Sequence, residues 1–161
     1  MERKQINEHD LRLNSYDIWK NRWFLLTGGS YEKGDYNTMT VAWGSVGCMW
    51  NKIFVQVVVR ASRYTHTFME KYDTFSLCAF PENQRETLSY LGKVSGKDED
   101  KISRSGLTPE AAARVEAPVF KESELAFECR KIYVDLMKPE RFLDPAIEKH
   151  YNGSDYHYIY F

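Results

Sequence analysis

The sequence lacks the cysteine patterns and the long apolar runs that several classes of protein need. Its three cysteines, Cys48, Cys78 and Cys129, form no CxxC pair and no Cys/His cluster, so the sequence predicts no metal site. Each of them lies among apolar neighbours, which favours buried free thiols. No apolar run approaches the roughly 18 residues of a membrane span, and positions 1–10 are too charged for a signal peptide. We therefore expect a cytoplasmic protein with no membrane partner.

A surplus of positive charge is also missing. The chain has 22 Lys and Arg against 23 Asp and Glu, a formal net charge of −1. Proteins that bind the phosphate backbone of nucleic acids usually carry a basic surplus, so we expect no nucleic-acid partner. This balance of charge does not exclude a local basic site. The glycines do not form the GxGxxG turn of a dinucleotide-binding fold, and the spacing in the glycine- and lysine-rich run 92–97 differs from that of a phosphate-binding loop.

Aromatic residues are plentiful at 15% of the chain, and the hydrophobic content of 43% is typical of a globular protein. A chain of 161 residues is long enough for one domain with its own core. Runs of β-branched and aromatic residues predict six strands. They are expected over 22–27, with a turn at Gly28-Gly29, and over 36–43, 53–60, 74–80, 124–137 and 156–161. The run 53–60 is too apolar for an edge strand.

Within 124–137 the alternation of apolar residues changes parity at Arg130-Lys131, which predicts a β-bulge. In the run 156–161 the alternation is still running at the last residue, and we expect the natural strand to extend further. Helices are fewer: 65–72, 83–92, one beginning at Thr108-Pro109-Glu110, and a short one at Asp144-Pro145. Many strands and few helices, without a βαβ rhythm, predict an antiparallel barrel with helical inserts. We expect a single domain over 1–161, with 1–20 as an N-terminal extension.

One segment has the composition of an anion site. Arg60 ends a predicted strand, and the next five residues supply Ser62, Arg63 and Thr65 where a helix is expected to begin. The first amides of a helix lack internal partners and lie at the positive end of its dipole. Guanidinium groups and hydroxyls add strong donors for phosphate oxygens. The residues alone leave open an equal alternative, in which Ser62 or Thr65 only caps the helix and the arginines are solvated.

A second segment, 37–44, carries small polar and apolar residues into a glycine, which lets a ligand approach the backbone closely. Alone it is a weak signal. The order LLTGG, YNTMTVAWGSVG, VVRASRYTHTFME, LGKVSGKDEDK, a Thr-Pro dipeptide and DYHYIYF, however, resembles the flavin reductase-like, FMN-binding split-barrel family from about Trp23 onward. The resemblance implies a mostly β, antiparallel, six-stranded Greek-key split β-barrel with a few short helices. It also implies a homodimer that binds FMN at or near the subunit interface.

The same resemblance assigns roles to particular residues. The ring of FMN would lie beside Met39, Thr40, Val41, Ala42 and Trp43, and its phosphate beside Arg60, Ser62, Arg63 and Thr65. A loop that approaches the flavin would contribute Ser95, Lys97 and Lys101. His157 matches a histidine that often lies close to the flavin or the nicotinamide site, and is the candidate catalytic residue. A solvated loop at 95–101, a core position for Trp43 and a buried core histidine at His157 are the competing interpretations.

The implied function is that of a flavoprotein oxidoreductase. Flavin chemistry belongs to the cofactor, and the protein supplies orientation and electrostatics. We expect NADH or NADPH to deliver a hydride to the flavin N5, with free flavin, iron or another small molecule as electron acceptor. Without a dinucleotide-binding turn, the nicotinamide would have to stack on the exposed flavin face. The alternative is an FMN-binding electron carrier or flavin-binding module without nicotinamide-dependent activity.

Overall fold

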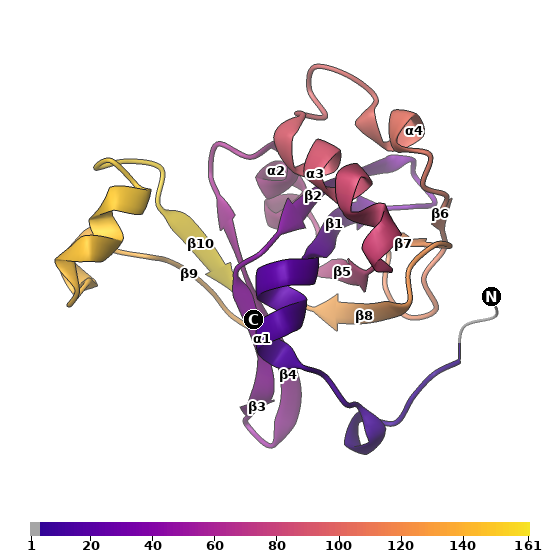
Figure 1. Cartoon of the computed structure of the whole chain (residues 1–161), viewed down its shortest axis with the longest axis horizontal. Helices are drawn as coiled ribbons and strands as arrows, with labels where there is room; N and C mark the ends of the chain where they lie inside the picture. Colours follow the sequence, from indigo (N-terminus) through magenta and orange to yellow (C-terminus); the bar gives the residue numbers. More distant parts are fainter. Residues whose placement is uncertain (1–3) are drawn as a thin grey trace.

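The computed structural model describes residues 4–161 and consists mainly of antiparallel sheets with short helices. The first sheet has the order β2-β1-β5-β8: β1 Phe24–Ser30, β2 Asp35–Val41, β5 Thr74–Ala79 and β8 Leu125–Arg130. The second has the order β3-β4-β10-β9: β3 Gly44–Met49, β4 Lys52–Arg60, β9 Val134–Leu136 and β10 His157–Tyr160. A short pair, β6 Pro109–Glu110 and β7 Val119–Phe120, adjoins β5 (Figure 1). The fold class expected from the sequence is confirmed.

The strand β1 continues through Gly28 and Gly29, so the turn predicted there is wrong. The turn lies at 31–34 and overlaps Lys33-Gly34-Asp35, which the sequence also indicates as a turn. The glycines serve close packing inside the strand, because a Cβ on Gly28 would lie 3.3 Å from the backbone nitrogen of Met69. The strand β3 was not predicted, since its two glycines weaken the strand pattern. Gly44 is needed there because a Cβ would lie 2.4 Å from the Trp19 ring.

The predicted β-bulge at Arg130-Lys131 is also wrong. β8 ends at Arg130 in the first sheet, and the chain enters the second sheet at Val134 as β9. The backbone nitrogen of Lys131 donates to Asp73 O at 2.9 Å, and that of Ile132 donates to Phe161 O at 2.8 Å. The linker is therefore bonded first to one sheet and then to the other. The apolar residues change parity here because the chain passes from the first sheet to the second, and each sheet turns its own face toward the core.

The core between the two sheets contains alternate residues of the strands. Its fully buried members include Phe24 and Leu26 of β1, Leu77 of β5 and Val57 of β4. β4 is an interior strand of its sheet, as predicted. The α1 helix (Ser15–Asp17) and the π-helical turn η2 (Ile18–Arg22) close one side of this core with Ile18 and Trp19, which are 5% and 6% exposed. The second half of the predicted N-terminal extension thus packs on the barrel, whereas residues 1–3 lie outside the described residues.

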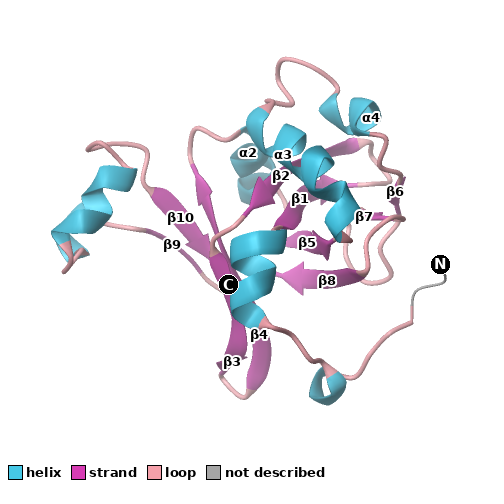
Figure 2. Ribbon diagram, in the orientation of Figure 1, coloured by secondary structure: helices cyan, strands magenta, loops and turns pink. Residues whose placement is uncertain are grey.

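Helices cover the outer face of the first sheet. These are the α3 helix (Arg85–Lys93), preceded by the 3₁₀ turn η3 (Glu82–Gln84), and the α4 helix (Lys101–Ser105) (Figure 2). They bury a second apolar cluster against the sheet. This cluster contains Leu25, Cys78, Leu88, Leu91 and Phe120. β1 is therefore buried on both faces, which explains why its sequence is a continuous apolar run rather than an alternating one.

The predicted helices are mostly found. The α2 helix (Tyr64–Lys71) and α3 lie within a few residues of the predicted bounds. The helix predicted to begin at Thr108 is wrong, because Pro109 and Glu110 form β6. Thr108 O accepts from the Lys121 nitrogen at 2.9 Å, so pairing with the β7 segment satisfies this backbone in an extended conformation. The short helix predicted at Asp144-Pro145 is η5 (Pro145–His150), where Asp144 Oδ1 accepts from the Ala146 nitrogen at 2.9 Å.

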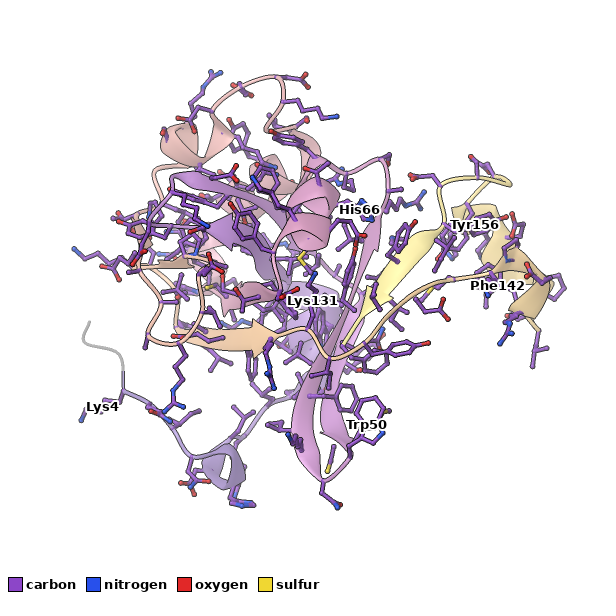
Figure 3. All side chains as sticks on the ribbon, turned by 180° about the vertical axis from the view of Figure 1, so that it is seen from behind. Lys4, Trp50, His66, Lys131, Phe142 and Tyr156 are labelled. Atoms are coloured by element: carbon purple, nitrogen blue, oxygen red, sulfur yellow. The ribbon has the colours of Figure 1, made fainter. Side chains whose placement is uncertain are left out.

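Residues 137–156, between β9 and β10, project away from the two sheets and are called the arm (Figure 1). The arm contains η5 and the 3₁₀ turn η4 (Pro139–Arg141). Phe142 and Tyr156 lie together on it, far from Trp50 at the tip of the β3–β4 hairpin (Figure 3). A further 3₁₀ turn, η1 (Glu8–Asp10), lies near the N-terminus. None of the helices in residues 4–161 is long and apolar enough to cross a membrane.

The three thiols lie in different environments. Cys78 is buried, and burial raises the pKa of the partly buried Cys129 to about 12. Cys48 is exposed, so the prediction of a buried thiol is wrong at this position. It lies near the tip of the β3–β4 hairpin, where the neighbouring Met49 is also exposed because the hairpin extends beyond the packed sheets.

Candidate functional site

The segment 60–65 turns directly from β4 into α2. The Arg63 nitrogen donates to Arg60 O at 3.0 Å, and Arg63 itself is the N-cap residue, with no side-chain capping bond. Ser62 and Thr65 are bonded elsewhere, so the interpretation in which one of them only caps the helix is wrong. The His66 amide donates to Arg63 O at 2.8 Å, and the two helical amides before it have no intrahelical acceptor. They lie at the positive end of the helix dipole.

A hollow of about 60 Å³ adjoins this helix start. One water molecule needs roughly 10–15 Å³ of such space, so the hollow has room for a larger polar group. It brings together residues of β2, of the α2 start and of the loop that follows α3. Six of the predicted site residues line it: Met39, Ser62, Arg63, Thr65, Ser95 and Lys101. Asn37, Tyr64 and Gly96 also line it and were not among the predicted residues.

Three cationic side chains line this hollow: Arg63, Lys101 and the exposed Lys93. Arg63 donates from Nη2 to Gly92 O, and Lys101 donates from Nζ to Leu91 O at 2.9 Å and Val94 O at 2.8 Å. Both therefore lie at the C-terminal end of α3, where the helix dipole favours positive charge. In residues 4–161 neither of them forms an ion pair with a carboxylate. Positive charge therefore dominates the lining of the hollow.

Lys101 is a buried cation, with 3% of its surface exposed. Burial and the nearby charge of Arg63 lower the pKa of Lys101 to about 8. Burial likewise lowers the pKa of Arg63, with the charge of Arg60 as a second cause. Two of the three ammonium donors of Lys101 are used by carbonyl groups, which leaves one for a further acceptor. An anion in the hollow would stabilise both cations.

The loop after α3 closes tightly over the hollow. Asn37 is 4% exposed and donates from Nδ2 to Thr65 Oγ1 at 2.8 Å. A Cβ on Gly96 would lie 2.2 Å from Asn37 Oδ1, so a side chain there would displace either the Asn37 amide or the loop. Lys97 is exposed, and its Nζ lies 5.4 Å from the centre of the Tyr64 ring. This part of the chain is packed on the site rather than being only a solvated loop.

The predicted ring-binding residues alternate between two environments. Met39 and Val41 are buried in the core between the sheets, and of the five only Met39 also lines the hollow. Thr40 faces α3 and donates from Oγ1 to Leu88 O at 2.5 Å. Ala42 is half-buried, and Trp43 is 46% exposed, so Trp43 is not a core residue. Strand geometry explains the split, since successive side chains point to opposite faces.

A separate aromatic cluster surrounds His157. Its ring lies 5.3 Å from that of Trp43, and its Nδ1 is 3.0 Å from the Tyr151 hydroxyl. The side chain is 8% exposed, and burial, together with the charge of Arg60, lowers the pKa of His157 to about 4. The imidazole is neutral near pH 7. His157, Trp43 and Arg60 do not line the hollow.

Arg60 and Ser62 are bonded to the arm. Arg60 donates from Nη2 to His150 O at 2.6 Å, and its Nη1 lies 3.8 Å from Asp155 Oδ2. Ser62 donates from its nitrogen to Asp155 Oδ1 at 3.0 Å and from Oγ to Oδ2 at 2.6 Å. Asp155 was not predicted, because no local pattern connects it to a serine 93 positions earlier. Asn37 lies within the segment 37–44, whose polar residues indicate a ligand contact.

A larger groove of about 490 Å³ lies at the other end of α3. Leu88 and Arg85 of α3 contribute to it, and Arg85 stacks on Trp23 at 3.5 Å. Arg22 is already paired with Glu124 and donates to Phe80 O at 2.7 Å. None of the predicted site residues lines this groove. In the described part of the chain no group of three or more His, Cys, Asp and Glu residues has the geometry to hold a metal ion.

Comparison with known proteins identifies the class. The family model of the flavin reductase like domain matches residues 22–136, so the chain belongs to this family. A curated relative, an uncharacterized protein of Archaeoglobus fulgidus, is 27% identical over 115 residues, which are 71% of this chain and 63% of the relative. The chain thus spans less than two thirds of the length of that relative.

Solved structures share the fold. Flavoredoxin of Desulfovibrio vulgaris (Miyazaki F) superposes with a TM-score of 0.66 at 21% identity, over 99% of this chain and 73% of that chain. Flavoredoxin from Methanosarcina acetivorans gives 0.64 at 25% identity, over 99% and 72%. An FMN-binding domain of a flavin reductase-like enzyme from Shewanella baltica gives 0.65 at 18% identity, over 91% and 69%. The architecture is that of flavin reductase-like, FMN-binding proteins.

Proposed function

We propose that the chain binds FMN and that the hollow at the start of α2 takes its phosphate. The observation that carries this proposal is the pair of cations, Arg63 and Lys101, which line the hollow without forming an ion pair in residues 4–161. A phosphate monoester carries a charge of about −1.5 to −2 at pH 7, which matches the two cations. Thr65, Ser62, Ser95 and the α2 amides supply further polar groups.

The geometry favours Arg63 over Arg60 as the main phosphate ligand. Arg63 lines the hollow, whereas Arg60 is paired with Asp155 and bonded to the arm. Arg60 and Lys97 would act from a distance, through their charge. The proposed ring-binding segment begins at Met39, which lines the hollow, and ends at Trp43, whose indole is exposed. Between them lie Thr40, Val41 and Ala42.

We propose an oxidoreductase that uses NADH or NADPH and a small-molecule electron acceptor. Bound FMN would supply the hydride-accepting chemistry, and the chain would bind and orient it. His157 remains the candidate residue near the reacting centre. Its depressed pKa means that it is neutral at pH 7, so it would orient a ligand through a hydrogen bond rather than deliver a proton. The alternative is an FMN-containing electron carrier, to which the likeness to two flavoredoxins lends support.

We also propose a cytoplasmic homodimer with FMN near its interface. The second sheet exposes several large apolar side chains on its edge strand and on the adjoining linker and hairpin. They are Ile132, Tyr133, Val134, Leu136, Met49, Trp50 and Ile53, each 38% or more exposed. Contiguous exposed apolar surface commonly marks a protein interface. The net charge of −1 supports the expectation that neither nucleic acid nor a membrane surface is the partner.

A visible absorption spectrum tests FMN binding. The purified protein, incubated with FMN and separated from free ligand, is expected to keep a yellow flavin spectrum. A protein that retains no FMN would overturn the proposal. Anaerobic mixing of the yellow form with NADH or NADPH then separates the two functions. Bleaching of the flavin absorption by either nicotinamide supports the reductase. If neither nicotinamide bleaches it, the electron carrier is favoured.

A further inference from the structure

Asp155 holds an unusual position at the proposed phosphate site. It is carried by the end of the arm in the left-handed backbone region, with φ of 54°. Its carboxylate accepts two hydrogen bonds from Ser62, one from the amide and one from the hydroxyl, and lies 3.8 Å from the Arg60 guanidinium. An amide, a hydroxyl and a guanidinium are the donors that proteins use for phosphate. The carboxylate therefore occupies an anion-binding arrangement.

Asp155 lies among positive charges. Arg60, Arg63, Lys101 and the exposed Lys93 supply four, and Asp155 offsets one of them by acting on Arg60 and Arg63. Ser62 belongs both to the lining of the hollow and to the Asp155 contact, so the carboxylate is adjacent to the hollow. A phosphate in the hollow would lie near the negative charge of Asp155, with Ser62 between them. The attraction of Arg63 and Lys101 acts against that repulsion.

We propose that Asp155 is an internal anion that opposes phosphate at this site and so limits the preference of the protein for FMN over riboflavin. This inference rests on the proposed FMN function. Riboflavin lacks the phosphate, so the charge of Asp155 acts on FMN alone. The arm, through this one carboxylate, lowers the net positive charge available to a phosphate dianion by one.

The test is the substitution Asp155→Asn, which keeps the shape and an acceptor oxygen for Ser62 and removes the charge. Dissociation constants of FMN and riboflavin are measured by flavin fluorescence at low and high salt. We expect FMN to bind roughly fivefold more tightly and riboflavin to be unchanged, since a single charge at a partly exposed position has an effect of this order. High salt should reduce the gain.

A matched control is Asp144→Asn, which removes the same charge from the same arm. Asp144 is bonded to the Ala146 nitrogen within η5, and it does not line the hollow. This control should leave the ratio of the two affinities unchanged. Equal or weaker FMN binding by Asp155→Asn, or a parallel change for riboflavin, would overturn the proposal. Circular dichroism and thermal unfolding establish that both variants are folded.

The design separates this proposal from the flavin function. If the wild-type protein binds neither FMN nor riboflavin, the proposed function has failed, and inorganic phosphate becomes the probe. Phosphate should then raise the melting temperature of Asp155→Asn more than that of the wild type and of Asp144→Asn, because ligand binding to the folded state stabilises it. Equal stabilisation of all three proteins would show that Asp155 does not oppose an anion.

Discussion

At the scale of single residues, Arg60 and Arg63 carry the same charge but have different partners. Arg63 lines the hollow and donates to Gly92 O, whereas Arg60 is paired with Asp155 and held by His150 O. A truncated charge-assisted contact typically costs about 1.5–3 kcal/mol. We therefore expect Arg63→Ala to weaken FMN roughly ten- to a hundredfold and to affect riboflavin little. Arg60→Ala should cause a smaller loss.

Titration of both ligands with both variants checks this expectation. Equal losses of FMN and riboflavin in Arg63→Ala would mean that the arginine supports the fold by capping α3, with no contact to phosphate. A larger loss in Arg60→Ala than in Arg63→Ala would reverse the assignment of the two arginines.

From the pKa of Lys101 we expect both the stability of the protein and its affinity for FMN to depend on pH. Its pKa of about 8 in the folded protein lies below the ordinary lysine value of 10.5. The unfolded chain thus binds more protons between about pH 8 and 10.5, so this group makes the free energy of unfolding rise with pH in that window. Phosphate requires the charged form, and FMN affinity should fall as the pH rises above about 8, by up to roughly tenfold per unit.

FMN titrations from pH 7 to 9.5, with riboflavin as the reference ligand, measure this effect. Lys101→Arg keeps the charge over the whole range, so its ratio of FMN to riboflavin affinity should stay flat. A falling ratio in the variant as well would assign the titration to another group.

At the scale of elements, the loop after α3 depends on a close approach between Gly96 and β2. A Cβ at Gly96 would lie 2.2 Å from Asn37 Oδ1, and Asn37 in turn bonds Thr65. Gly96→Ala should displace the loop from the hollow and weaken FMN about tenfold or more, with a modest change in melting temperature. Gly34→Ala is the control, since Gly34 has positive φ, open space around it and no part in the hollow. It should lower the melting temperature and leave FMN affinity unchanged.

The elements themselves were predicted to different degrees. Runs of β-branched and aromatic residues indicated most strands, because these residue types suit a pleated, buried surface. The period-two alternation within 124–137 was misread at Arg130-Lys131, where the change of parity marks a passage between two sheets. The Thr108-Pro109 dipeptide has the residues of a helix start, but pairing of Pro109 with Phe120 holds it extended. In both places a partner distant in the sequence decides the outcome.

At the scale of the whole molecule, the exposed apolar side chains of the second sheet predict the oligomeric state. Val134 and Leu136 of the edge strand β9 are 48% and 38% exposed. If they form the proposed homodimer interface, the double substitution Val134→Lys with Leu136→Lys should yield a folded monomer, because two buried charges cost far more than the contacts they replace. Sedimentation or light scattering measures the mass of each protein.

Tyr16→Lys serves as the control for this experiment. Tyr16 is 75% exposed but lies in α1, outside the second sheet, so the variant should keep the mass of the wild type. A monomeric wild type would contradict the homodimer. A dimeric double variant would place the interface on another face.

The sequence alone determined the mostly β class and the order of its main strands, and it predicted an anion site at the segment 60–65. The strands depend on runs of β-branched and aromatic residues, and the predicted site depends on the residue types at a strand–helix junction. The tertiary structure decided that Arg63 and Lys101 line one hollow. It also decided that Asp155 bonds Ser62 and lies beside Arg60, and that Gly96 packs closely on Asn37. The members of these contacts lie up to 93 positions apart, and only strand register and helix packing bring them together. No local spacing encodes that proximity.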